Sequence, residues 1–123
     1  MPNAFDLRKV ELYSALLPDE RSISLKEGLA RLSAKPLILL GGDEFVATIE
    51  NSHLLPDEWK FPVNGATRRI IFPRQFFLNG EQNRCFPFTC HDVGEWDYGF
   101  IGINERLFAS DQFAVLPMDI TGS

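Results

Sequence analysis

The chain has 123 residues, of which 45% are hydrophobic, and a formal net charge of −5 at pH 7. This length fits one domain over residues 1–123, and the apolar content excludes an intrinsically disordered chain. The acidic balance argues against unspecific nucleic-acid binding and favours a basic partner.

The N-terminus and the longest apolar run predict the cellular compartment of the protein. The first residues contain no basic region followed by an apolar one, as a signal peptide would. The longest apolar run, residues 36–40, is too short to cross a bilayer. We therefore expect a cytoplasmic protein that makes no contact with a membrane.

The N-terminal third predicts helices. Residues 5–17 show both a strand-like alternation and a helical apolar face, and their good helix formers favour a helix. Residues 24–33 carry a clearer signal, because Ser24 and Glu27 form the S-x-x-E capping-box pattern. An apolar stripe follows at helical spacing, made of Leu25, Leu29 and Leu32.

Beyond residue 35 the pattern predicts mostly strands. Residues 36–40 and 45–50 flank Gly-Gly-Asp-Glu, which reads as a hairpin loop, and a helical turn is expected at Pro56. Further strands are expected at 68–72, 75–78, 85–90, 96–103 and 112–118, with turns at 79–80 and 92–95. Because no helix separates these strands, the sequence predicts an α+β fold: one or two N-terminal helices packed on a mainly antiparallel sheet of five to seven strands.

Residues 41–45 read GGDEF, and over these five residues the chain resembles the diguanylate cyclases. In that family the glycines form a tight hairpin that admits a guanine nucleotide, and the acids hold metal ions. The surrounding sequence departs from the family, since only 40 residues precede Gly41 and residues 32–35 lack the inhibitory R-x-x-D pattern. We interpret the string as a turn and expect no cyclase activity.

A second similarity involves LLPDEW, the following Asn64-Gly65 and the later run FPFTCHDVGEWDYGF. Together they resemble an immunity-protein superfamily whose members carry Leu-Pro, Glu, an aromatic residue and then Asn-Gly. The interval from Pro56 to Asn64 is short for that pattern. The resemblance implies a protein that binds another protein.

The predicted strand that begins near residue 95 holds the candidate binding residues. Trp96 and Tyr98 alternate with Glu95 and Asp97, so a strand would present the aromatic side chains on one face and the acids on the other. Trp and Tyr are frequent anchors of protein interfaces. A core strand with a solvated back carries the same pattern, so the sequence leaves open whether Trp96 is buried or exposed.

Two other sites compete with this one. His91, Asp92 and Glu95 are metal-ligand or acid–base residue types, which would suit a small-ligand or metal-dependent enzyme. Neighbouring residues on a strand point apart, however, which weakens this hypothesis. Residues 59–84 mix aromatic and basic side chains as single-stranded nucleic-acid surfaces do. Alternatively, those arginines pair with the acidic C-terminal third of the chain.

The sequence therefore favours a small acidic protein-binding module of the inhibitor or immunity type. We expect no catalytic residues, no cofactor and no metal. The partner is expected to be another protein, basic in character. Cys85 and Cys90 lie five residues apart on one predicted strand and so face opposite ways, which predicts reduced thiols.

Overall fold

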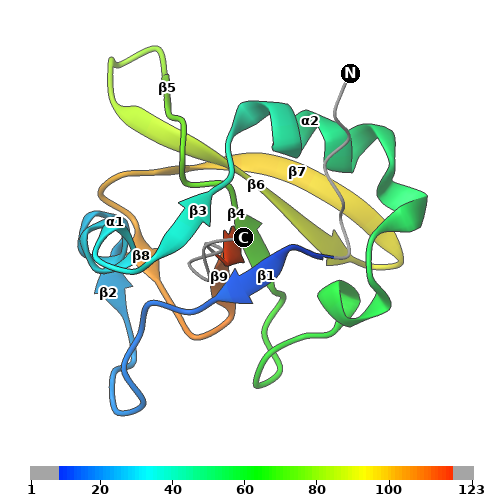
Figure 1. Ribbon diagram of the computed structural model, residues 1–123, viewed down its shortest axis with the longest axis horizontal. Coiled ribbons are helices and arrows are strands. Elements are labelled where there is room, and N and C mark those ends of the chain that lie inside the picture. Colours follow the sequence, from blue (N-terminus) through cyan, green and yellow to red (C-terminus); the bar gives the residue numbers. More distant parts are fainter. Residues whose placement is uncertain (1–8, 118–123) are drawn as a thin grey trace, which may run out of the picture.

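The computed structural model describes residues 9–117, which form two α-helices, two short 3-10 helices and nine strands (Figure 1). In chain order these are β1 Glu11–Tyr13, β2 Ile23–Ser24, α1 Leu25–Ser33, β3 Leu37–Leu39, α2 Gly42–Glu50, η2 Ser52–Leu54, η3 Asp57–Lys60, β4 Arg69–Ile71, β5 Phe77–Leu78, β6 Arg84–Asp92, β7 Glu95–Gly102, β8 Arg106–Leu107 and β9 Asp111–Pro117.

Seven of the strands form one sheet. Its order is β1-β9-β4-β6-β5, with β3 also paired to β9 and β7 paired to β6. Only the β4–β9 pairing is parallel among the described strands, and β2 and β8 form a separate two-stranded sheet. The predicted α+β fold with a mainly antiparallel sheet is confirmed.

The two helices cover opposite faces of this sheet. Leu25 and Leu32 of α1 pack into one apolar cluster together with Ile71 of β4. The neighbouring Ile70 points the other way, into a second cluster that Phe45 of α2 covers. Figure 1 shows the sheet between α1 and α2. We refer to these two sides as the α1 face and the α2 face.

Helix α1 begins where the sequence predicts. The Ser24 hydroxyl accepts a hydrogen bond from the Glu27 amide at 3.1 Å. The Glu27 carboxylate accepts instead from Arg31 Nε at 3.0 Å, so only half of the predicted capping box is made. The helix ends at Ser33, shortly before Pro36, which cannot continue it.

The helix predicted over 5–17 is wrong for the part that the structure describes. Residues 11–13 form β1, which pairs with β9, and residues 5–8 lie outside the described range. Leu12 packs against the α2-face cluster and Tyr13 against the α1-face cluster. Contacts on both faces of the sheet need the two-residue period of a strand, and this overrides the helix propensity of the segment.

The hairpin loop predicted at GGDE is also wrong, because these residues begin α2. Gly41 is the N-cap, and its amide donates to the Glu44 carboxylate at 2.6 Å. Asp43 and Glu44 lie in the first turn, where the helix dipole favours negative charge. Phe45 and the fully buried Thr48, three residues apart, turn toward the sheet. The hairpin that the resemblance to diguanylate cyclases implied is therefore not formed here.

The two cysteines are unpaired and lie on opposite faces of β6, as the spacing predicts. The helical turn expected at Pro56 is present as η3. Neither helix in the range 9–117 combines the length and hydropathy that crossing a membrane requires. The last residue of the strand predicted over 112–118 lies outside the described part of the chain.

Candidate functional site

The candidate binding residues lie on β7, the outer strand of the β6–β7 hairpin. Val93 and Gly94 join the two strands with positive φ values of 50° and 79°. Two such residues form a type I′ turn, whose twist matches that of the flanking strands. The turn fixes the pairing register, in which His91 lies opposite Trp96 and Asp92 opposite Glu95.

The aromatic residues of β7 lie on the α2 face. Trp96 is half-buried, packs against the α2-face cluster and contacts the His91 ring at a centroid distance of 5.1 Å. Tyr98 contacts the Phe45 ring edge-to-face at 5.9 Å and is 37% exposed. Trp96 is therefore a residue of the core boundary, and Tyr98 a surface residue held by α2.

Phe100 extends this aromatic row and is more exposed than either. It is 56% exposed, and its ring lies 5.8 Å from Phe77 and 6.5 Å from Phe45. Phe100 is not among the binding residues predicted from the sequence, although Phe100 continues the alternation of Trp96 and Tyr98. We call Glu95, Trp96, Asp97, Tyr98 and Phe100 the β7 surface.

The acidic residues of β7 lie on the α1 face and are exposed. Asp97 lies opposite Cys90 on β6. Burial raises the pKa of the Cys90 thiol, and the nearby carboxylates of Asp97 and Asp92 raise it further. Glu95 lies next to the hairpin turn and is exposed as well. The β7 surface thus presents acids on one face and aromatic side chains on the other.

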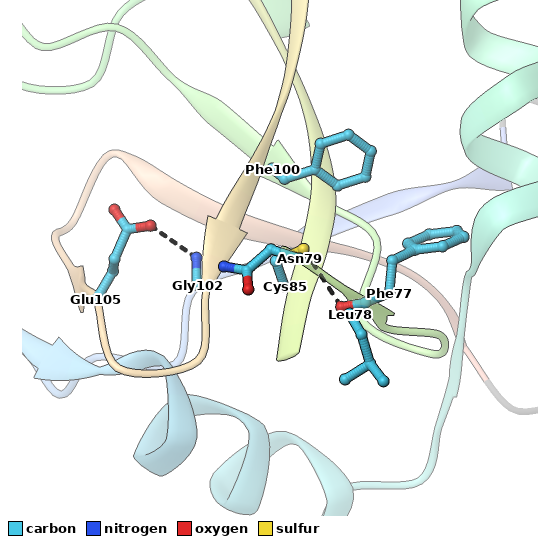
Figure 2. A pocket seen from close by; sticks show the side chains of 7 residues that line it. All are labelled: Phe77, Leu78, Asn79, Cys85, Phe100, Gly102 and Glu105. Atoms are coloured by element: carbon cyan, nitrogen blue, oxygen red, sulfur yellow. Dashed lines mark hydrogen bonds between the residues drawn. The ribbon is translucent and has the colours of Figure 1, made fainter. Parts of the chain in front are cut away.

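A small pocket adjoins the end of β7. It has a volume of about 340 Å³ and is lined by Phe77, Leu78, Asn79, Cys85, Phe100, Gly102 and Glu105 (Figure 2). The Cys85 thiol lies 3.3 Å from the Phe77 carbonyl, to which it donates, and the Gly102 amide donates to the Glu105 carboxylate at 2.6 Å. Figure 2 shows the Phe77 and Phe100 rings on the same side of the hairpin. The pocket therefore continues the aromatic row with an apolar recess.

The structure does not bring the three residues of the proposed catalytic or metal site together. His91 lies on the α2 face against Trp96, whereas Asp92 and Glu95 form the last pair of the hairpin on the α1 face. Within residues 9–117, no three His, Cys, Asp or Glu side chains gather as a metal site.

Part of the basic stretch 59–84 is engaged in internal contacts, although Phe61, Phe76 and Phe77 are exposed. Trp59 and Phe72 are buried in the α2-face cluster, so neither ring is open to a base. Arg69 donates two hydrogen bonds to Asp111 at 2.7 and 2.9 Å, and Arg74 pairs with Glu44 at 3.0 Å. The structure thus contains the pairing of Arg69 with the acidic C-terminal third that the sequence offers as an alternative to nucleic-acid binding.

No protein-family model, no curated protein and no solved structure matches this chain.

Proposed function

We propose that this protein is a small acidic protein-binding module, of the inhibitor or immunity type, and that the β7 surface is its binding face. One observation carries this proposal: partly exposed aromatic side chains and exposed carboxylates alternate along a single strand. Tyr98 and Phe100 are 37% and 56% exposed, whereas Phe side chains are most often buried. Aromatic residues that lose water on binding supply much of the affinity at protein interfaces.

The charge of this region indicates the chemistry of the partner. Residues 92–123 hold six acidic residues and one basic residue. Glu95 and Asp97 are exposed and form no ion pair with another described residue. A basic partner would meet these carboxylates first, and charge of this kind mainly sets the rate of association. Binding of this type needs neither a cofactor nor a metal.

The experiment removes the two charges without changing the shape of the strand. The partner is first captured on the wild-type protein, and its association with the double variant Glu95→Gln/Asp97→Asn is then measured at several salt concentrations. We expect the association rate at low salt to fall about tenfold and its salt dependence to flatten. The fold should be unaffected, because solvated acids contribute little to stability.

A matched control carries the same charge change elsewhere. Glu11 on β1 and Asp19 in the turn after it are both exposed. In the sheet, β9, β4 and β6 separate β1 from β7. The variant Glu11→Gln/Asp19→Asn should bind the partner at the wild-type rate. If the wild-type protein captures no partner, or if both double variants behave alike, the β7 surface is not the binding face.

A further inference from the structure

Strand β7 has a free edge. It pairs with β6 from Glu95 to Gly102, and it pairs with no other strand in the described part of the chain. Such an edge offers unpaired N–H and C=O groups to any extended chain that reaches it. Natural sheets usually keep edge strands short or cover them, whereas this one runs for eight residues.

The hydrogen-bond pattern shows which backbone groups point outward. The Pro87 carbonyl accepts from the Phe72 amide, which lies on the side of β6 away from β7. In an antiparallel ladder a residue that points away from its neighbour forms a non-hydrogen-bonded pair with it. Pro87 lies opposite Phe100, so Phe100 turns its N–H and C=O away from β6. By the same alternation, Trp96 and Tyr98 also point outward.

Other contacts agree with this orientation and mark the limits of the free edge. The Gly102 amide also points outward, and the Glu105 carboxylate accepts from it at 2.6 Å. The Val93-Gly94 turn closes the other end. Between these limits, the outward groups of Trp96 to Phe100 span about 14 Å of strand. An added chain can therefore pair with the three outward-facing residues.

We propose, building on the protein-binding function above, that the partner adds one extended segment antiparallel to β7. The partner residues opposite Trp96, Tyr98 and Phe100 place their side chains on the α2 face, beside these rings, and are apolar. The residues that alternate with them lie on the α1 face, and those opposite Glu95 and Asp97 are Lys or Arg. The segment thus alternates apolar and basic residues. Main-chain hydrogen bonds supply affinity and the alternating side chains supply specificity.

A second copy of this chain fits the edge less well. Pairing two β7 strands about Tyr98 would gather Glu95 and Asp97 from both copies on one face of the joined sheet. Strand β7, EWDYGFIG, contains no Lys or Arg that could offset them, and each copy carries a net charge of −5. Like charges across a strand pair are destabilising, and acids on an edge strand oppose self-association. The same acids attract a basic segment.

The test uses short synthetic peptides of alternating valine and lysine, carrying a fluorophore, and the unaltered protein. In the proposed pairing the valines oppose Trp96, Tyr98 and Phe100, so only the valine amides bond to β7. A peptide N-methylated on its lysines should bind within about threefold of the parent peptide. A peptide N-methylated on its valines should bind about tenfold more weakly or worse, because it loses these hydrogen bonds. Both peptides have the same composition and charge.

Three results would overturn strand addition. They are equal binding of the two N-methylated peptides, no binding of any of them, and equal binding of a peptide in which the same lysines and valines stand in two blocks. The protein alone could instead form a dimer that the lysine-methylated peptide dissociates. That result would show that a second copy of the chain occupies the edge of β7. In another outcome, the captured partner associates more slowly with the Glu95→Gln/Asp97→Asn variant although none of the peptides binds the protein. That result would support the β7 surface as the binding face and refute strand addition. If that variant has no effect either, both proposals fail.

Discussion

Asp111 is a buried carboxylate whose replacement by asparagine should destabilise the fold. It is 2% exposed, at the start of β9, and accepts two hydrogen bonds from Arg69. It also accepts from the Phe108 amide at 2.8 Å. The hydrogen bonds to Asp111 raise the pKa of the Arg69 guanidinium. Asp111→Asn removes the charge and turns an amide N–H₂ group toward either Arg69 or Phe108.

The magnitude follows from these contacts. Removing one partner of a buried ion pair costs about 3–5 kcal/mol, mostly because the other charge is left without compensation. The Arg69 side chain is 26% exposed, so water can partly solvate it, and the asparagine oxygen still accepts one hydrogen bond. We therefore expect the free energy of unfolding to fall by about 3 kcal/mol. A domain of this size has about 6–18 kcal/mol in all, so the loss is readily measured.

Equilibrium urea denaturation at neutral pH measures this loss, which should appear as a lower midpoint with an unchanged m-value. The matched control is Asp57→Asn, which breaks an exposed ion pair of 3.3 Å with Lys60 and should change the free energy of unfolding by less than about 0.5 kcal/mol. Replacing both partners, as Arg69→Met/Asp111→Leu, should recover much of the loss. An Asp111→Asn variant within about 0.5 kcal/mol of wild type would refute the reasoning.

Three further changes test other parts of the structure. Gly28→Ala should lower the melting temperature despite better helix propensity, because the new Cβ would lie 2.6 Å from the buried Leu107 side chain; a higher melting temperature would contradict this packing. Hydrogen bonds from Arg31 lower the pKa of Glu20 from its usual 4.5 to about 2, so its stabilising contribution is complete above pH 4.5 and lost as the pH falls toward 2. Glu20→Gln should therefore be less stable than wild type at neutral pH and equal to it near the acidic limit, as chemical denaturation at each pH will show. Asp97→Asn should lower the pKa of Cys90 and speed its alkylation by iodoacetamide at mildly alkaline pH, and an unchanged rate would place Asp97 away from the thiol.

Where a few neighbouring residues decide the conformation, the sequence by itself was sufficient. Ser24 and the leucines that follow it predict α1, because capping and helical spacing act within one or two turns. Residues 92–95 predict the tight turn of the β6–β7 hairpin, since Gly94 tolerates the positive φ that the turn requires. The strand periodicity of the second half predicts a largely antiparallel sheet, and the structure contains it.

Two segments with ambiguous local signals were decided by tertiary contacts. Residues 11–13 have good helix formers, yet β9 offers them a strand partner and apolar contacts on both faces. The glycines at 41 and 42 resemble a turn, yet burial of Phe45 against β7 and the Gly41–Glu44 hydrogen bond stabilise a helix there. In both cases packing against distant residues outweighs propensities worth less than about 1 kcal/mol per residue.

Some features of the candidate site follow from the sequence, and others depend on the tertiary structure. Alternation along one strand places Trp96 and Tyr98 on one face and the acids on the other, because the side-chain period of a strand is two. The sequence could not show that Phe77 and Phe45, from distant elements, join the aromatic row, or that Trp96 lies at the core boundary. Nor could it show that β7 is an edge strand, because the number of partners a strand has depends on how the whole chain pairs and not on the strand's own residues.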